Sequence, residues 1–397
     1  MRILFVTPVV PSPSYGRRPY NFIRYLAGKH RVDLACFLTD PARDMVALRQ
    51  LAGWGVRVRT VEHSACRGIW NCATGWPRLE PLRTLWVRSP ALKALIRELT
   101  GRNSYDVAHF DRMRMGHFAL EVPKVPRVVD FTDALMLYLK RSVTPHRSVP
   151  GRVIDAWEKW RIPAYERRLL SRLEAGICCS RVDAEVFRQY HPGFPVEVII
   201  NSVDAEHFKP RSSEEKSPRL VFTGTFSYFA NLDSLFYFME QIWPEVRRRH
   251  EGIQLDLIGA KPPERVSQLG QLPGVRVLAD VPDMADHLHP EDIFICPLRV
   301  ASGMRNKVLE AMASGMAAVS SSIGVEGLNV QPGEHYLEAD EPGKFADCID
   351  QVMNSADLRR RLGQHGRKFV LEQHSAEAAG KALEDVYKKA GSSKFGH

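Results

Sequence analysis

The sequence predicts an α/β protein made of two doubly wound domains in series. Its 397 residues exceed what one hydrophobic core usually organises. Short apolar runs, without the polar alternation of half-exposed strands, alternate with longer amphipathic segments. A hydrophilic break at 209–219, KPRSSEEKSPR, precedes a restart of this pattern. We therefore expect one domain over 1–208, a second over 209–375, and a C-terminal helix over 376–397 that packs back toward the first domain and has a disordered end.

The first domain is expected to form a parallel sheet covered by helices on both faces, because its apolar runs are short and separated by helical patterns. The expected strands are RILFVTP (2–8), RVDLACFL (31–38), VRVRTVE (56–62), YDVAHF (105–110), RVVDFTDA (127–134), GICCS (176–180) and VEVIINSV (196–203). The expected helices include YNFIRYLA (20–27), AWEKWRIPAYERRLLSRLEA (156–175) and VDAEVFRQY (182–190).

The second domain repeats this organisation. Its expected strands are RLVFTGT (219–225), IQLDLIG (253–259), VRVLADV (275–281), DIFICPL (292–298) and MAAVSSS (316–322), with a long helix at 232–250 and a charged helical tail that ends in GSSKFGH. Ligands of such sheets bind beyond the carboxyl ends of the strands, so two such domains predict a cleft lined by the loops that follow strands.

The composition limits the class of partner. Lys and Arg number 55 against 46 Asp and Glu, a formal net charge of +9, which favours anionic partners. The basic loops are not interleaved with aromatic residues, so we expect no nucleic acid partner. The seven cysteines form no zinc-type spacing, and we expect reduced thiols and no metal site.

No apolar run approaches the ~18 residues of a transmembrane helix, and no signal-peptide pattern is present. The expected location is the cytoplasm, with peripheral contact at the inner membrane face as an alternative.

Two loops that follow strands carry glycines suited to close approach of a ligand. Gly16 lies in PVVPSPSYGRRPYN, and Gly224 precedes Thr225 in TGTFSYFANLD. Backbone amides at such turns can hold phosphate. The first loop could instead be a solvated basic turn, and strand–glycine–helix turns are common, so neither loop assigns a site alone.

The segment RVASGMRNKVLEAMASG (299–315) is more informative. We expect a helix beginning near Met304, whose amides and the cations Arg305 and Lys307 suit a diphosphate. Glu310 shares a helix face with Asn306 and Lys307 and suits a sugar diol. The alternative is a solvent-exposed polar face with a Glu–Lys pair.

GMRNKVLEAMASG, followed by the EGL of VEGLNV, resembles the nucleotide-sugar motif of GT-B glycosyltransferases, and within them glycosyltransferase family 4, the retaining group 1 enzymes. Other stretches fall in the same order as in that family, namely TPVVPSPSYGRRPYNFIRYLA, YDVAHFD, RVVDFTDA, GICCSRVDAEVFR, INSVDAEHFKP and TGTFSYFANLDSLFYF. The resemblance covers roughly residues 1–380 and is strongest to exopolysaccharide sugar transferases of the PEP-CTERM/EpsH-associated type. It implies the GT-B fold, with two Rossmann-like domains facing a cleft.

The resemblance also implies roles for individual residues. Glu310 matches the second glutamate of the family's E-x7-E motif, which holds the nucleotide ribose. Arg305 and Lys307 would act catalytically on the diphosphate, and Gly16 would face the donor phosphates from the other domain. The implied donor-binding residues are Gly16, Gly224, Thr225, Ser302, Gly303, Met304, Asn306 and Glu310.

Several positions depart from the family pattern. Ser302 stands where the first glutamate of E-x7-E is expected, which leaves the donor sugar open. Ser227, Tyr228 and Asn231 stand in the region where relatives often have an arginine and a lysine. A further departure is Ser202, which replaces the usual glycine of the interdomain signature.

A histidine of many relatives corresponds here to Asp130 or Asp133, with His109 as a nearby alternative. We expect Asp133 to be catalytic, either orienting the acceptor hydroxyl or stabilising an oxocarbenium-like centre. The alternative is that Asp133 caps a helix.

The implied reaction transfers a sugar, with retention, from a UDP- or GDP-sugar to a lipid-linked or polysaccharide acceptor, with no metal or other cofactor. Residues 76–100 are the expected membrane or acceptor surface, or else an ordinary buried helix face. Two other readings stay open: an epimerase or phosphorylase of the same architecture, and a non-catalytic sugar- or nucleotide-binding protein.

Overall fold

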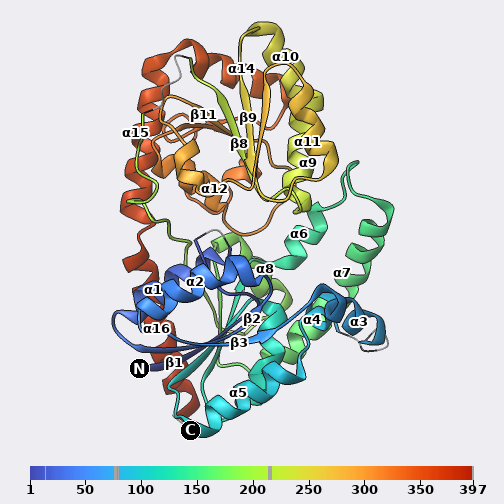
Figure 1. Cartoon of the computed structure of the whole chain (residues 1–397), viewed down its shortest axis with the longest axis vertical. Helices are drawn as coiled ribbons and strands as arrows, with labels where there is room; N and C mark the ends of the chain where they lie inside the picture. Colours follow the sequence, from blue (N-terminus) through green and yellow to red (C-terminus); the bar gives the residue numbers. More distant parts are fainter. Residues whose placement is uncertain (14, 76–77, 79, 213–216, 396–397) are drawn as a thin grey trace. The chain divides into compact units, whose positions relative to one another are not determined.

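The computed structural model describes residues 1–13, 15–75, 78, 80–212 and 217–395, and the chain divides into two compact units (Figure 1). Unit 1 comprises Met1–Leu139, Val153–Ser202 and the segment from Ala376 onward. Unit 2 comprises Lys140–Arg152 and Val203–Ser375. The division at Ser202 and Val203 falls earlier than the expected boundary after residue 208. The segment Lys140–Arg152, which we expected in the first domain, groups with unit 2.

Unit 1 is built on a parallel sheet with strand order β3-β2-β1-β4-β5-β6-β7 among its described residues. Its strands are β1 (Arg2–Thr7), β2 (Arg31–Leu38), β3 (Arg57–Glu62), β4 (Val107–Asp111), β5 (Arg127–Thr132), β6 (Ala175–Cys178) and β7 (Val196–Val198). Ile3 of β1 pairs with Val32 of β2 and Val107 of β4, and all three are buried. The strand order reverses at β1 and β4, so the loops after these strands lie where ligands of such sheets bind.

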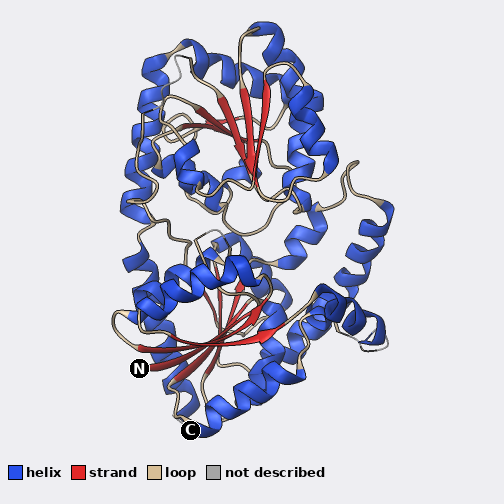
Figure 2. Ribbon diagram, in the orientation of Figure 1, coloured by secondary structure: helices blue, strands red, loops and turns tan. Residues whose placement is uncertain are grey.

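The helices of unit 1 lie on both faces of this sheet (Figure 2). They are α1 (Arg17–Ala27), α2 (Pro41–Gly53), α3 (Ala65–Gly75), α4 (Leu82–Trp86), α5 (Pro90–Arg102), α6 (Leu135–Arg141), α7 (Val149–Leu170), α8 (Arg181–Tyr190) and α16 (Ala376–Phe395), with a 3-10 segment at Met113–Glu121. The facing ends of α6 and α7, within Lys140–Arg152, group with unit 2.

The C-terminal helix α16 is part of unit 1. Leu383 and Tyr387 are buried in the core that also contains residues of β1, β2 and α1. Gly380 lies against the ring of Tyr25 of α1, and a Cβ at that position would overlap the ring. This contact brings the two helices close together, and it requires a residue without a side chain.

The sequence predicts disorder over GSSKFGH, and α16 extends through Phe395. Residues 396–397 lie outside the described part of the chain. Packing of the preceding turns on unit 1 explains why residues of weak helix propensity extend the helix.

Unit 2 repeats the architecture, with strand order β10-β9-β8-β11-β12-β13 in its described part. Its strands are β8 (Leu220–Thr223), β9 (Leu255–Gly259), β10 (Val275–Ala279), β11 (Ile293–Cys296), β12 (Ala317–Ser320) and β13 (Leu337–Glu338). Leu220 of β8 pairs with Leu255 of β9 and Ile293 of β11, and all three are fully buried. The short strand β13 was not expected from the sequence.

The helices of unit 2 also lie on both faces of its sheet (Figure 2). They are α9 (Phe229–Tyr237), a π-helical segment (Phe238–Ile242), α10 (Trp243–Arg249), α11 (Glu264–Ser267), 3-10 segments at Gln268–Gln271 and Met284–His287, α12 (Asn306–Ala313), α13 (Ser322–Val325), α14 (Pro342–Asn354) and α15 (Ala356–Gln373).

The hydrophilic break at 209–219 is not exposed throughout. Arg219 is buried, and its guanidinium pairs with Asp292 at 2.7 Å and Asp256 at 3.1 Å. These pairs tie the start of β8 to its neighbours in the sheet. Residues 213–216 of the break lie outside the described residues.

Candidate functional site

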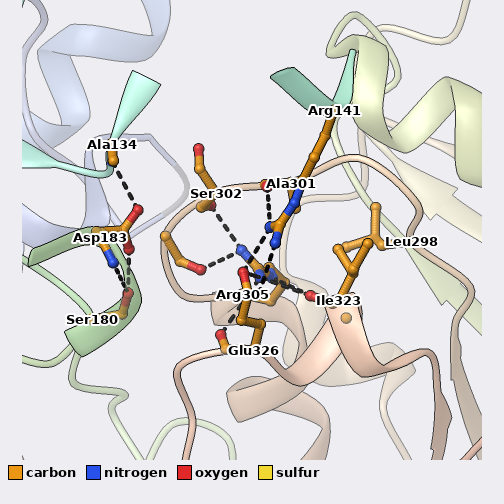
Figure 3. A network of polar contacts seen from close by, with 12 residues as sticks. Ala134, Arg141, Ser180, Asp183, Leu298, Ala301, Ser302, Arg305, Ile323 and Glu326 are labelled. Atoms are coloured by element: carbon orange, nitrogen blue, oxygen red, sulfur yellow. Dashed lines mark hydrogen bonds and ion pairs between the residues drawn. The ribbon is translucent and has the colours of Figure 1, made fainter. Parts of the chain in front are cut away.

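The loop between β11 and α12 is held from within by Arg305 (Figure 3). Its guanidinium donates to the backbone carbonyls of Ser302 at 2.8 Å, of Gly303, and of Ile323 at 2.7 and 3.1 Å. Arg305 is 6% exposed, and Gly303 has a φ of 72°, in the left-handed region that favours glycine. The arginine therefore fixes the path of this loop.

The position of Arg305 corrects one expectation. α12 begins at Asn306 rather than near Met304, and Arg305 occupies the N-cap position with extended backbone and no side-chain cap hydrogen bond. The positive charge of Arg305 lies beside the loop. Its guanidinium N–H groups donate to the backbone carbonyls named above. A catalytic contact of Arg305 with a diphosphate stays a prediction.

A second arginine supports the same loop. Arg141 donates to the carbonyl of Ala301 at 3.0 Å and pairs with both carboxylate oxygens of Glu326, at 2.7 and 2.9 Å (Figure 3). Glu326, in the EGL stretch, also lies 3.8 Å from Arg305. The Glu326 carboxylate thus lies beside both Arg141 and Arg305. Together the two arginines donate hydrogen bonds to the backbone carbonyls of three consecutive residues of the loop.

Lys307 connects α12 to the loop after β8. Its ammonium donates to the carbonyl of Thr223 at 3.1 Å and to the side-chain oxygen of Asn231 at 3.0 Å, and it lies 4.6 Å from the ring centre of Phe222. Burial lowers the pKa of Lys307, and the nearby charge of Arg305 lowers it further. An anion bound beside this ammonium would oppose both effects.

The glycine loop after β8 is tightly packed. Asn231 donates to the carbonyl of Thr225 at 3.0 Å, and a Cβ at Gly224 would approach the Asn231 side chain to 2.8 Å. A Cβ at Gly259, the last residue of β9, would overlap the carbonyl oxygen of Gly224. The structure therefore brings Lys307, Gly224 and Thr225 together around Asn231, at the carboxyl end of the sheet.

The other donor-motif residues lie on or beside α12. Glu310 is 3% exposed, whereas Ser302, Met304 and Asn306 are partly buried. Glu310 is close enough to Lys307 to raise the pKa of that lysine, although burial has the larger and opposite effect. The polar face of α12 is therefore at least partly buried, rather than fully exposed to solvent.

The two remaining predicted site residues lie in unit 1. Gly16 adopts a φ of 69° at the N-cap of α1. Asp133 is partly buried between β5 and α6, and its N–H donates to the carbonyl of Phe131 at 2.8 Å. Neither belongs to the cluster around Lys307 within unit 2.

Asp130 and His109, the alternatives to Asp133, belong to the interior of unit 1. Asp130 pairs with Arg18 at 2.6 Å, and Arg18 also donates to Asn201 at 2.8 Å. His109 is hydrogen bonded to Tyr387 at 2.9 Å, and burial lowers the pKa of His109 to about 4. These contacts tie α1 and α16 to the sheet.

Sequence reasoning missed Arg141 and did not assign roles to Asn231 and Glu326. Arg141 lies far from the motif in sequence, in the tail of α6, and nothing local marks it. The sequence motif EGL includes Glu326, but the separation of Glu326 and Arg305 along the chain does not indicate that the two residues pair.

Two parallel sheets, each with helices on both faces, define the GT-B fold, and solved structures with this fold match almost the whole chain. Sucrose-phosphate synthase from Thermosynechococcus elongatus has a TM-score of 0.73 and 15% identity, covering 99% of this chain and 100% of its own. HepE from Anabaena, in complex with UDP and glucose, has a TM-score of 0.67 and 14% identity, covering 98% and 99%. At these identities the likeness defines the fold.

The family is indicated by the sequence of unit 2. Residues 217–355 match the family model described as Glycosyl transferases group 1, so this part of the chain is a group 1 glycosyltransferase domain, which is a transferase domain. Among curated proteins, spore coat protein SA of Bacillus subtilis is 25% identical over 101 residues, 25% of this chain and 27% of its own length. An uncharacterized 44.6 kDa protein in the cps region of Klebsiella pneumoniae is 21% identical over 178 residues, 43% and 45%. The chain thus matches less than half the length of these relatives.

Two features are absent from the described residues. They contain no helix long and apolar enough to cross a membrane. They also contain no group of three or more His, Cys, Asp or Glu side chains placed to hold a metal ion. The expected membrane or acceptor surface at 76–100 includes α4 and most of α5, while residues 76–77 and 79 lie outside the described part.

Proposed function

We propose that the protein is a retaining glycosyltransferase of family 4 that transfers a sugar from a UDP- or GDP-sugar to a lipid-linked or glycan acceptor. We further propose a role in exopolysaccharide or cell-surface glycan synthesis, of the PEP-CTERM/EpsH-associated type. The group 1 domain over residues 217–355 supports the transfer reaction. The presence of UDP, and of UDP-glucose, in structures of HepE supports a nucleotide-sugar donor.

The observation that carries the proposal is the cluster at the carboxyl edge of the unit 2 sheet. Lys307 joins the glycine loop after β8 to α12, and Arg305 holds the loop after β11. The cations Lys307 and Arg305 are thus held in position beside the loops after β8 and β11 by contacts within the protein, without a bound anion. Such an arrangement suits a nucleoside diphosphate, because its groups need no reorganisation when charge appears.

The chemistry of the leaving group explains why fixed cations matter. Breaking the bond between the anomeric carbon and the donor phosphate leaves negative charge on the β-phosphate. Groups that stabilise this charge more than the intact donor lower the barrier. We assign this role to Lys307, with Arg305 acting on the phosphate directly or through the loop that it holds.

The remaining predicted residues divide between the two ends of the donor. Glu310 would accept hydrogen bonds from the ribose hydroxyls, and the backbone around Gly224, Thr225, Gly303 and Met304 would face the phosphates. Ser302 in place of the first motif glutamate leaves room for a donor sugar that differs from the family's usual ones. Gly16 and Asp133 would act from unit 1, and no metal is required in this scheme.

Peripheral contact with an anionic inner membrane would bring the enzyme to a lipid-linked acceptor. The net charge of +9 supports this part of the proposal.

Nucleotide binding and donor turnover test the proposal. UDP and GDP are screened by thermal shift, since a ligand that binds the folded state raises the apparent Tm. Release of the nucleoside diphosphate is then followed with UDP- and GDP-sugars, for the wild type, Glu310→Ala and Glu372→Ala. Glu372 is an exposed residue of α15 and serves as the matched control. We expect Glu310→Ala to weaken nucleotide binding by about tenfold, which corresponds to ~1.4 kcal/mol, and the control to leave it unchanged. If no nucleotide binds, or if Glu310→Ala binds as tightly as the wild type, the proposal is wrong.

The same assay separates the other two classes. An epimerase would return a sugar nucleotide with a changed sugar, and a phosphorylase would require inorganic phosphate. A non-catalytic protein would bind nucleotide and release no sugar. The anomeric configuration of a transfer product, read by NMR, decides between retention and inversion.

A further inference from the structure

Two neighbouring strands of unit 1 end in polar side chains that none of the predicted sites includes. β4 ends at Asp111 and β5 ends at Thr132, and Asp111 pairs in register with Asp130 of β5. Both strand ends therefore lie at the carboxyl edge of the sheet, next to each other. This is the edge where ligands of doubly wound domains bind.

The backbone at this edge is strained. Arg112, which follows β4, has a φ of 68°, and Thr132 has a φ of 65°. Positive φ is uncommon for any residue other than glycine and a genuine outlier for a β-branched one such as threonine. The pairing of β5 with β6 also shifts register between Asp130 and Thr132. Strain and irregular pairing at a strand end re-aim side chains and concentrate at functional sites.

Several polar side-chain atoms at or beside these strained positions are buried without hydrogen-bond partners in the described part of the structure. Among the described residues, neither carboxylate oxygen of Asp111 nor the hydroxyl of Thr132 has one, and the same holds for Nε of Arg114. The Asp111 side chain is 2% exposed, and its carboxylate lies 3.8 Å from the guanidinium of Arg112. A buried polar group without a partner costs free energy, so its retention calls for an explanation.

Asp130, directly beside Asp111, provides a comparison within the same sheet. Its carboxylate accepts from Arg18 at 2.6 Å and from the Thr132 N–H at 2.8 Å. The fold can therefore supply donors to a carboxylate at this edge, and the described residues supply none to Asp111. Burial raises the pKa of Asp111 to about 6, so at neutral pH the group is an ionised hydrogen-bond acceptor with unused capacity.

The chemistry of the cluster selects its ligand. A carboxylate repels phosphate, and the described residues hold no group of three or more metal-ligating side chains. A sugar hydroxyl can donate to a carboxylate oxygen and can also accept from a guanidinium, and two adjacent hydroxyls can address both oxygens of one carboxylate. We propose that Asp111, Thr132 and Arg114 form a subsite for the acceptor, in which Asp111 accepts hydrogen bonds from a pair of adjacent sugar hydroxyls. This inference rests on the proposed function and assigns the acceptor chemistry to a pyranose diol within unit 1.

The experiment compares Asp111→Asn with Asp385→Asn, the same substitution at an exposed position of α16. The probes are methyl α-glucoside, methyl α-galactoside and methyl α-mannoside, added to the full-length protein with its UDP- or GDP-sugar donor. Release of nucleoside diphosphate above the rate of donor hydrolysis reports use of the acceptor. We expect at least one probe to stimulate the wild type, and Asp111→Asn to lose at least about tenfold of that stimulation. Asp385→Asn should behave as the wild type.

Two further readouts separate this subsite from a structural role. Nucleotide binding, followed by thermal shift with UDP and GDP, should be unchanged in Asp111→Asn, and its Tm at neutral pH should exceed that of the wild type. Thr132→Val should weaken stimulation without affecting nucleotide binding.

Each contrary result has a distinct meaning. If Asp111→Asn is stimulated like the wild type, if its Tm is lower, or if no probe stimulates the wild type, the acceptor subsite is refuted. If UDP and GDP fail to bind any variant, the donor proposal fails as well.

Discussion

Replacing Asp111 with asparagine isolates the cost of holding an ionised group where it has no hydrogen-bond partner. Burial raises the pKa of this carboxyl from its ordinary value of 3.8 to about 6. Because the pKa in the folded state lies above that in the unfolded state, ionisation weakens folding, and stability rises as pH falls from about 6 to about 4. A difference of about 2 pKa units corresponds to about 3 kcal/mol at pH 7, since each unit is worth about 1.4 kcal/mol. Asparagine carries no such cost.

Other charges near Asp111 set the size of this effect. Arg112 and Arg114, which follow β4, and Arg18 of α1 lower its pKa, whereas Asp130 of β5 raises it. Each of these charges has a smaller effect on the pKa of Asp111 than burial has, so burial sets the direction of the shift. The variant should be more stable than the wild type at neutral pH, and the difference should shrink to below about 1 kcal/mol near pH 4.

Thermal unfolding of both proteins between about pH 4 and pH 7.5 measures the difference. For a unit of roughly 200 residues, 3 kcal/mol corresponds to a rise in Tm of about 6–12 °C at neutral pH. The wild-type profile alone is not diagnostic, because His109 acts in the opposite direction. Burial lowers the pKa of His109 from 6.5 to about 4, so it favours folding at neutral pH and loses this contribution as pH falls between those values.

His109 is present in both proteins, so its contribution cancels when the stability of the wild type is subtracted from that of Asp111→Asn. The remaining pH dependence is that of Asp111. A difference in Tm that does not change with pH, or a variant that is less stable at pH 7, would refute the reasoning. Asp385→Asn should follow the wild type throughout, because that carboxylate is exposed.

Three other substitutions test the packing and the site. Lys307→Met should reduce donor turnover by at least about 100-fold in the nucleoside diphosphate release assay, because it removes a fixed cation from the developing phosphate charge; turnover close to that of the wild type would contradict the role of Lys307. Gly259→Ala should weaken nucleotide binding in a UDP and GDP thermal-shift titration and lower the Tm, because its Cβ would overlap the Gly224 carbonyl; unchanged binding would show that the loop adapts. Gly380→Ala should lower the Tm, by an amount corresponding to about 1–3 kcal/mol, through overlap with Tyr25, and leave nucleotide binding intact; a loss of binding would contradict the separation of the two roles.

The sequence was sufficient to predict both sheets except for the two-residue strand β13, because strands buried on both faces appear as short apolar runs whatever their neighbours are. It also indicated the loops to inspect, since the strand-end loops of adjacent parallel strands meet at one edge. It did not predict where α12 begins. Arg305 is not a usual N-cap residue, and apolar periodicity does not distinguish a helix start at Met304 from one at Asn306.

The sequence could not predict residues whose role depends on a partner far away along the chain. Arg141 and Glu326 contact each other across a large sequence separation, and neither lies in a local pattern that predicts the pair. Asp111 presents the opposite case, because its distinguishing property is the lack of a hydrogen-bond partner in the described structure. A sequence shows which groups need partners, but only the three-dimensional arrangement shows which ones lack them.

The two arginines around Glu326 also change how the cations of the donor motif are understood. From the sequence, Arg305 was a charge aimed at a diphosphate, equivalent to Lys307. In the structure, Arg305 holds the carbonyls of Ser302 and Gly303, and Arg141 holds that of Ala301. In a trans peptide the C=O and N–H bonds lie in one plane and point in opposite directions, so each carbonyl that faces an arginine directs the N–H of the same peptide away from it. The arginines thus orient the peptide dipoles of the loop as well as contributing charge, and this effect would persist even where their own donors do not reach the ligand.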